Sequence, residues 1–204
     1  HEQSEMSDWL GPEAHTIKAS HYDDVKNGID EIVEFTEDPG KRSHLALGID
    51  VTFSSNLSRK LERITERIIR GELTRVKYFR SGGMRGELRQ IPEVIVGVDE
   101  KTLDELLPHW LERDVKKLAD HPIQIMLLEE IRMQLEFFAE YAEQIGQKSV
   151  ANKCRADLEI IEAVLKEKAD LRKLSPLEAL KNDRVFYEIF LALERCKKRL
   201  LTKR

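Results

Sequence analysis

Two acidic residues, Asp30 and Asp50, lie in the most apolar β-type segments of the chain. Asp30 opens the apolar run 30–35, and Asp50 falls near the end of segment 44–53. A carboxylate in a buried strand is unfavourable unless its charge is compensated. Pro39-Gly40 marks a turn between the two segments, so we expect a hairpin in which the two carboxylates converge. The usual compensation for such a pair is a hard divalent cation bound by oxygen ligands, and this indicates metal-assisted hydrolysis of a phosphodiester.

Composition limits the class of protein. The chain has 204 residues, 41% of them hydrophobic, which suits one domain or one domain with a helical appendage. The sequence contains no apolar run long enough for a membrane span and no signal-peptide pattern. Cys154 and Cys196 lack CxxC spacing, so we expect free thiols in a reducing compartment and a cytoplasmic location.

Positive charge is concentrated in one segment of an otherwise acidic chain. Residues 59–89 contain ten basic and four acidic residues, although the whole chain has a net charge of −4. A basic segment that follows an acidic motif suits a phosphodiester-cleaving site, because cations hold the backbone phosphates. The residues predicted to bind nucleic acid are Arg59, Lys60, Arg63, Arg80, Arg85 and Arg89. The alternative is a solvated amphipathic helix with ordinary Arg/Glu pairs.

The hydrophobic spacing predicts an α/β protein with a C-terminal helical extension. Helices are expected at 7–22, 56–70, 99–118, 122–145, 149–171 and 175–200, and strands at 29–35, 45–53, 73–79 and 91–98. Ser175-Pro176-Leu177-Glu178 has the pattern of a capping box at the start of the last helix. We expect a mixed α/β core over residues 1–120 and a helical bundle over residues 121–204.

The acidic pattern resembles a known superfamily. Asp24 and Asp30, followed after a turn by Gly48-Ile49-Asp50-Val51-Thr52, resemble the opening motifs of PD-(D/E)XK nucleases. The resemblance covers about residues 13–98. It implies the restriction-endonuclease-like fold, in which helices flank a mixed central sheet.

The resemblance also implies roles for individual residues. Asp30 and Asp50 would be direct ligands of Mg²⁺, for which Mn²⁺ substitutes, and the carbonyl of Val51 would complete the shell. Asp24, or its neighbour Asp23, would be the acid donated by the preceding helix. Each aspartate also has a structural alternative, as a turn residue, a strand-end cap or a solvated helix end.

One position departs from the family pattern. The family has a lysine where this chain has Thr52. Lys77 on the third predicted strand, with Arg75 on the same face, is the candidate catalytic replacement, and by the resemblance it would orient the attacking water. Its alternative role is a cross-strand partner for an acid such as Glu93. Glu34 is either an auxiliary acid or a surface residue.

These patterns predict a metal-dependent nuclease that acts on DNA. Hydrolysis of RNA is equally compatible with the sequence. The substitution at position 52 supports a different class, a catalytically inactive module for nucleic-acid binding or protein scaffolding. The glycine-rich segment 81–86 is a candidate clamp for a nucleic-acid backbone. The apolar stripes of the C-terminal helices indicate core packing, or a surface for a second copy or another protein partner.

Overall fold

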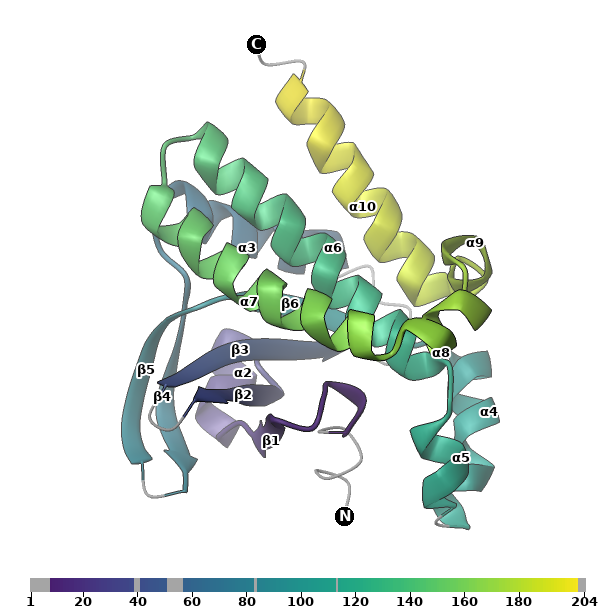
Figure 1. Cartoon of the computed structure of the whole chain (residues 1–204). Coiled ribbons are helices and arrows are strands. Elements are labelled where there is room, and N and C mark those ends of the chain that lie inside the picture. The colour runs from purple at the N-terminus through teal and green to yellow at the C-terminus, as the bar shows by residue number, and fades with distance from the viewer. Residues whose placement is uncertain (1–7, 39–40, 51–56, 83, 113, 202–204) are drawn as a thin grey trace.

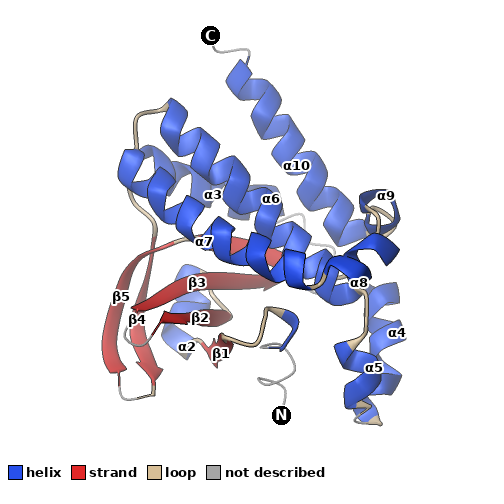
Figure 2. Ribbon diagram, viewed as in Figure 1, coloured by secondary structure: helices blue, strands red, loops and turns tan. Residues whose placement is uncertain are grey.

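The computed structural model describes residues 8–38, 41–50, 57–82, 84–112 and 114–201 (Figure 1). The fold is mixed α/β, as predicted, with the strands in the first half of the chain and most helices in the second (Figure 2). The strands are β1 (Ala14–Lys18), β2 (Glu31–Asp38), β3 (Lys41–Asp50), β4 (Thr74–Ser81), β5 (Met84–Ile91) and β6 (Glu93–Gly97). The helices are α2 (His21–Asn27), α3 (Leu57–Ile69), α4 (Glu100–Leu111), α5 (Val115–Ala119), α6 (Ile123–Gln144), α7 (Lys148–Glu167), α8 (Ala169–Leu174), α9 (Leu177–Leu180) and α10 (Arg184–Leu201).

The six described strands form two sheets. The larger has the order β1-β2-β3-β6, in which β1, β2 and β3 are antiparallel neighbours and β6 runs parallel to β3. Parallel neighbours need a long crossover connection, and here α3 and the hairpin of β4 and β5 lie in that connection. This hairpin is a separate two-stranded sheet, and it extends to one side of the molecule (Figure 1).

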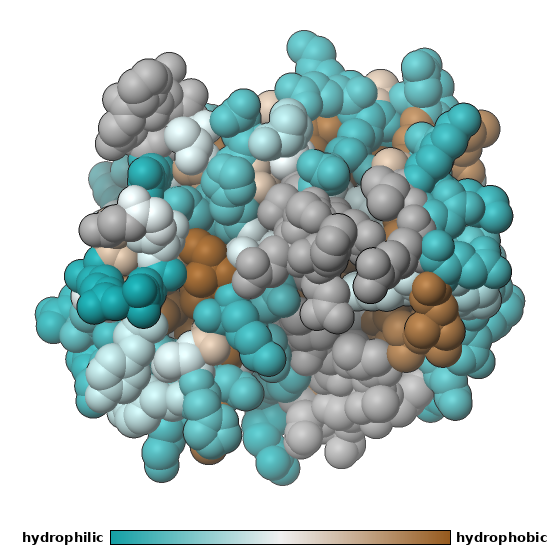
Figure 3. Space-filling view, turned by 90° about the horizontal axis from the view of Figure 1, so that it is seen from below, coloured by the Kyte–Doolittle hydropathy of each residue, from teal (hydrophilic) through white to brown (hydrophobic). Residues whose placement is uncertain are grey.

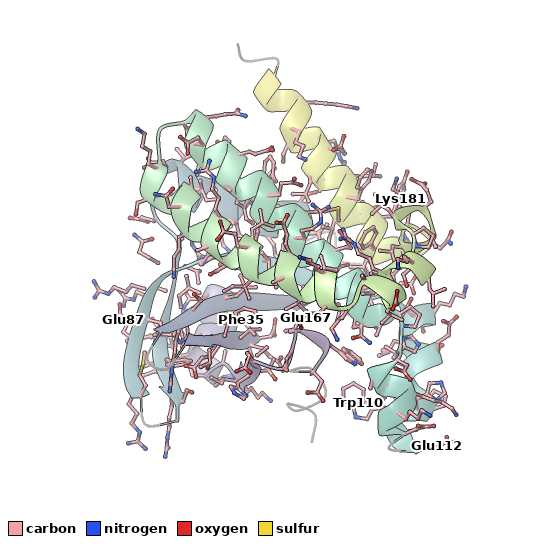
Figure 4. The ribbon with its side chains drawn as sticks, in the orientation of Figure 1. Phe35, Glu87, Trp110, Glu112, Glu167 and Lys181 are labelled. Atoms are coloured by element: carbon pink, nitrogen blue, oxygen red, sulfur yellow. The ribbon has the colours of Figure 1, made fainter. Side chains whose placement is uncertain are left out.

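Both faces of the larger sheet are covered. Val33 and Phe35 point to the larger hydrophobic cluster, which they share with α6 and α7; Figure 4 labels Phe35 on the sheet below α7. The alternate residue Ile32 and its cross-strand partner Ala46 pack instead against the hairpin, in a second cluster with Val76 and Phe79. This alternation follows from the two-residue period of a strand.

Helix α6 lies at the centre of the helical layer and is buried on most of its circumference. Gln134 ties it to β6, because its side chain accepts from the Ile95 amide at 2.9 Å and donates to the Ile95 carbonyl at 2.6 Å. One hydrophobic cluster contains residues from both sides of position 120. The division into domains 1–120 and 121–204 stays a prediction.

The prediction of a helix at 7–22 is wrong. Residues 14–18 form edge strand β1, paired with β2 over five residues. Helix α2 begins only after Ser20, whose side chain caps it by accepting from the Asp23 amide at 3.2 Å. Pairing with a neighbouring strand outweighs the weak local preference of so short a segment.

The predicted final helix is also divided. Helix α9 has Pro176 as its N-cap without a side-chain hydrogen bond, so the expected capping box does not form. Helix α10 begins after Asp183, whose Oδ1 accepts from the amides of Val185 at 2.9 Å and Phe186 at 3.1 Å. Likewise the predicted strand 91–98 begins later, because Pro92 separates β5 from β6 and cannot donate a ladder hydrogen bond.

Candidate functional site

The two predicted metal ligands lie at neighbouring strand ends, Asp30 just before β2 and Asp50 at the end of β3. Asp30 directly precedes β2, and its carbonyl accepts from the Ala19 amide at 3.0 Å. Asp50 is the last residue of β3, and its backbone pairs with Gly97 of β6. The pairing of β2 with β3 begins at Glu31 and Leu47, so the start of β2 lies beside the part of β3 that leads to Asp50.

The convergence of these acids on a metal stays a prediction. The side chain of Asp50 lies outside the described residues, as do Val51 and Thr52. Among the described side chains, no group of three or more His, Cys, Asp and Glu residues is arranged to hold a metal ion.

Asp23 and Asp24, adjacent on α2, have different environments. Asp24 is exposed, whereas Asp23 is fully buried. The Asp23 Oδ1 accepts from the Lys77 amide at 2.9 Å and the Asn27 side chain at 2.9 Å, and its Oδ2 accepts from the Tyr78 amide at 3.2 Å and the Ser20 hydroxyl at 2.7 Å. Burial alone raises the pKa of Asp23, but these hydrogen bonds outweigh burial and lower the pKa below its ordinary value.

The Asp23 carboxylate therefore anchors a bulge in β4. The register between β4 and β5 shifts between Val76 and Phe79, and the Lys77 and Tyr78 amides within this interval bond to Asp23. A bulge changes the direction of the side chains that it carries. Asp23 thus fixes where Lys77 and Tyr78 project.

Lys77 lies among aromatic rings. Its ammonium is 4.7 Å from the centroid of the Tyr22 ring and 5.0 Å from that of Tyr78, and the two rings meet edge to face with centroids 5.5 Å apart. The interaction with the Tyr78 side chain is the main cause that raises the pKa of Lys77. Lys77 is therefore a cation at neutral pH and suits charge compensation rather than proton abstraction.

The predicted nucleic-acid-binding residues divide into two groups. The first lies on α3, where the half-buried Arg63 pairs with buried Glu93, its Nη2 2.6 Å from Glu93 Oε1. Arg67 pairs with the other oxygen of Glu93, which also accepts from the Thr74 hydroxyl at 2.6 Å. Nearby on α3, Arg59 is exposed and Lys60 is half-buried.

The second group lies on the hairpin, where arginines face one another. Arg75 pairs across the strands with Arg89, and Arg80 with Arg85. Glu87 contacts the first of these pairs, with its Oε1 3.1 Å from Arg75 Nε, and Figure 4 labels it on the outer side of β5. Arg80 and Arg85 form no ion pair with any acidic residue in the described part of the chain.

Glu34 is buried within a closed polar cluster. Its carboxylate lies 3.3 Å from Arg42 Nη1 and 3.1 Å from His44 Nε2, and it accepts from the Ser81 hydroxyl at 3.0 Å. Burial lowers the pKa of His44, against the opposing effect of Glu34. This cluster joins the end of β4 to β2 and β3, a structural role rather than the exposed surface position that was one of the two predictions.

Sequence reasoning missed two kinds of residue. Tyr22 and Tyr78 adjoin Asp23 and Lys77 in the sequence, and the aromatic residues between the basic residues Lys77 and Arg80 were the available signal for Tyr78. Glu93, named as a possible cross-strand partner of Lys77, instead pairs with Arg63 and Arg67. Glu130 gave no such signal, because its burial depends on contacts with distant elements.

Glu130 gives a pH-dependent prediction. It is buried on α6, its Oε2 accepts from the Gly97 amide at 3.0 Å, and its Oε1 has no hydrogen-bond partner among the described residues. Burial raises the pKa of Glu130 well above its ordinary value of 4.5. The contribution of protonated Glu130 to the stability of the fold is therefore fully present below pH 4.5 and decreases as the pH rises. We expect the melting temperature of the wild type, but not of Glu130→Gln, to fall for this reason as the pH rises above about 5. If the melting temperatures of both proteins change with pH in the same way, the raised pKa assigned to Glu130 is wrong.

The comparisons with known proteins identify no relative. No family model, no curated protein and no solved structure matches the chain. In the described part of the chain, none of the helices has the length and apolarity needed to cross a membrane.

Proposed function

We propose that this chain is a metal-dependent nuclease with a restriction-endonuclease-like core, acting on DNA. The observation that carries the proposal is the backbone pairing that brings the start of β2, next to Asp30, beside the end of β3, which carries Asp50. Two carboxylates on adjacent strand segments are a donor set that suits Mg²⁺ or Mn²⁺. The antiparallel β1-β2-β3 meander, joined to parallel β6 through α3 and the hairpin of β4 and β5, is compatible with the proposed core.

Different residues of the chain would have different roles in the proposed site. Asp30 and Asp50 would hold the cation, with the Val51 carbonyl as a further donor, and Asp24 would assist from its exposed position on α2. The bound cation would lower the pKa of a water molecule and neutralise charge on the phosphate. Lys77 and the hairpin arginines would hold the nucleic-acid backbone by charge.

A second candidate is a nucleic-acid-binding module without hydrolysis, which could also serve as a scaffold. Thr52 stands where the family has lysine. The ammonium of Lys77 lies over two tyrosine rings, an arrangement that suits binding as well as it suits catalysis.

A cleavage assay separates these candidates. Plasmid DNA, single-stranded DNA and RNA are incubated with Mg²⁺ or Mn²⁺ and the wild type, Asp30→Asn, Asp50→Asn or the control Asp170→Asn. Asp170 is a suitable control because its side chain is 98% exposed and it pairs only at the surface of α8. We expect the wild type and the control to cut, and the other two variants to lose cutting while their circular dichroism stays unchanged.

The opposite outcome is equally clear. If the wild type cuts none of the substrates and neither metal raises its melting temperature, the nuclease proposal fails and the binding module stands. Equal cutting by Asp50→Asn and the wild type would remove Asp50 from the site.

A further inference from the structure

We propose that the hairpin and α2 form a surface that binds single-stranded nucleic acid by stacking bases on tyrosine. This tyrosine–arginine surface consists of Tyr22, Arg75, Lys77, Tyr78, Arg80, Arg85 and Arg89. The inference deepens the proposed function by naming its substrate class, and it rests on that function only for the cleavage that follows binding.

Charge is the first argument. The hairpin, residues 74–91, contains five basic residues and one acidic residue in a chain of net charge −4. Arginines stand directly opposite one another at two positions, Arg75 with Arg89 and Arg80 with Arg85. Glu87 offsets the charge of the first pair, whereas Arg80 and Arg85 pair with no acid in the described part of the chain. Like charges opposite one another destabilise a strand pair, so the second pair favours a bound polyanion. In Figure 3 strongly hydrophilic side chains gather at the edge of the molecule where the hairpin lies.

Exposed aromatic rings are the second argument. Tyr22 is 42% exposed and Tyr78 is 55% exposed, and neither belongs to a hydrophobic cluster. Their rings meet edge to face, with the Lys77 ammonium near both. Exposed aromatic rings beside cations are the elements with which proteins bind single strands, because every base has a face that can stack.

The anchored bulge is the third argument. The carboxylate of Asp23 holds the amides of both Lys77 and Tyr78, so the backbone that carries one ring is fixed to the helix that carries the other. The backbone that carries the two rings is therefore fixed before a ligand binds, which reduces the entropy lost on binding. Asp23 is a positioning residue for this surface.

Stacking on tyrosine selects the form of nucleic acid. In a duplex the base faces are covered by neighbouring bases, so the rings can reach them only in a single strand, a loop or a frayed end. An acidic protein segment would satisfy the arginines but would leave the tyrosine rings without a stacking partner. The combination of rings and arginines therefore favours a single strand over a duplex or an acidic protein.

Binding is measured by fluorescence anisotropy with labelled oligothymidylate and oligouridylate, a matched labelled duplex, and EDTA present throughout to prevent cleavage. The test variants are Tyr78→Ala and the double variant Tyr22→Ala/Tyr78→Ala. Tyr187→Ala on α10 is the matched control, because Tyr187 is 41% exposed and lies outside this surface. Tyr78→Phe keeps the ring and removes only the hydroxyl. Melting curves verify that each variant is folded.

We expect single strands to bind more tightly than the duplex, and each alanine substitution to weaken this binding by about 10-fold to 100-fold. Tyr187→Ala and Tyr78→Phe should bind within a few-fold of the wild type. Arg80→Ala/Arg85→Ala should flatten the dependence of log K on log salt by about 0.7 for each phosphate that the variant no longer neutralises.

Several results would overturn the inference: equal affinity for duplex and single strand, equal effects of Tyr78→Ala and Tyr187→Ala, or equally effective competition by polyglutamate. Binding is measured in EDTA and is therefore independent of cleavage. If the chain binds single strands but never cuts them, the nuclease proposal is wrong and the tyrosine–arginine surface is supported. If the chain cuts but Tyr78→Ala binds as tightly as the wild type, the tyrosine–arginine surface is wrong and the nuclease proposal is supported.

Discussion

Glu93→Ala is expected to lower the free energy of unfolding by about 3 to 5 kcal/mol, because it leaves two partly buried arginines without their buried counter-charge. The Glu93 side chain is 2% exposed and contacts Arg63, Arg67 and the Thr74 hydroxyl. The Arg63 side chain is 35% exposed and regains part of its hydration, so we expect the lower end of this range. Urea denaturation at neutral pH measures the difference.

Glu87→Ala is the matched control for this prediction. Glu87 also pairs with two arginines, but the partners are Arg75 and Arg89, whose side chains are 55% and 71% exposed. Exposed ion pairs contribute about 0 to 1 kcal/mol, so the control should change the unfolding free energy by less than about 1 kcal/mol. Similar losses for both variants would show that burial of Glu93 does not decide its contribution.

Asp23→Ala is expected to lower the free energy of unfolding by about 2 to 3 kcal/mol at neutral pH, because it removes a charged acceptor from two backbone amides of β4. The neighbouring Asp24→Ala, which alters an exposed side chain, should change stability by less than about 0.5 kcal/mol. Urea denaturation of both variants and the wild type measures the two effects.

The pH dependence of the Asp23 contribution has a definite sign. The pKa of Asp23 in the folded protein is below its ordinary value of 3.8, so its contribution is present above that value and is lost as the pH falls through the folded pKa. The difference in unfolding free energy between the wild type and Asp23→Ala should therefore be constant from about pH 7 to pH 5 and should become smaller below about pH 4. A gap that stays constant down to pH 2 would contradict the assigned hydrogen bonds.

Periodicity alone predicted the long elements of the fold. Helix α3 agrees with the predicted 56–70 and α6 with the predicted 122–145, because an apolar stripe that repeats over several turns is a strong local signal. Strand β1 was missed because its five residues gain their stability from pairing with β2. The division of the last predicted helix was missed because Asp183 caps α10 within an otherwise helical pattern.

The sequence by itself determined which residue types are available: acids in the β-type segments, a basic segment after them and an α/β order of elements. Only the tertiary structure decided which of the charged groups are used within the fold. Asp23 binds amides 54 and 55 residues further along the chain, and Glu93 binds arginines about 30 residues before it. A carboxylate takes its role from the donors that surround it, and chain folding brings those donors from positions that no local pattern indicates.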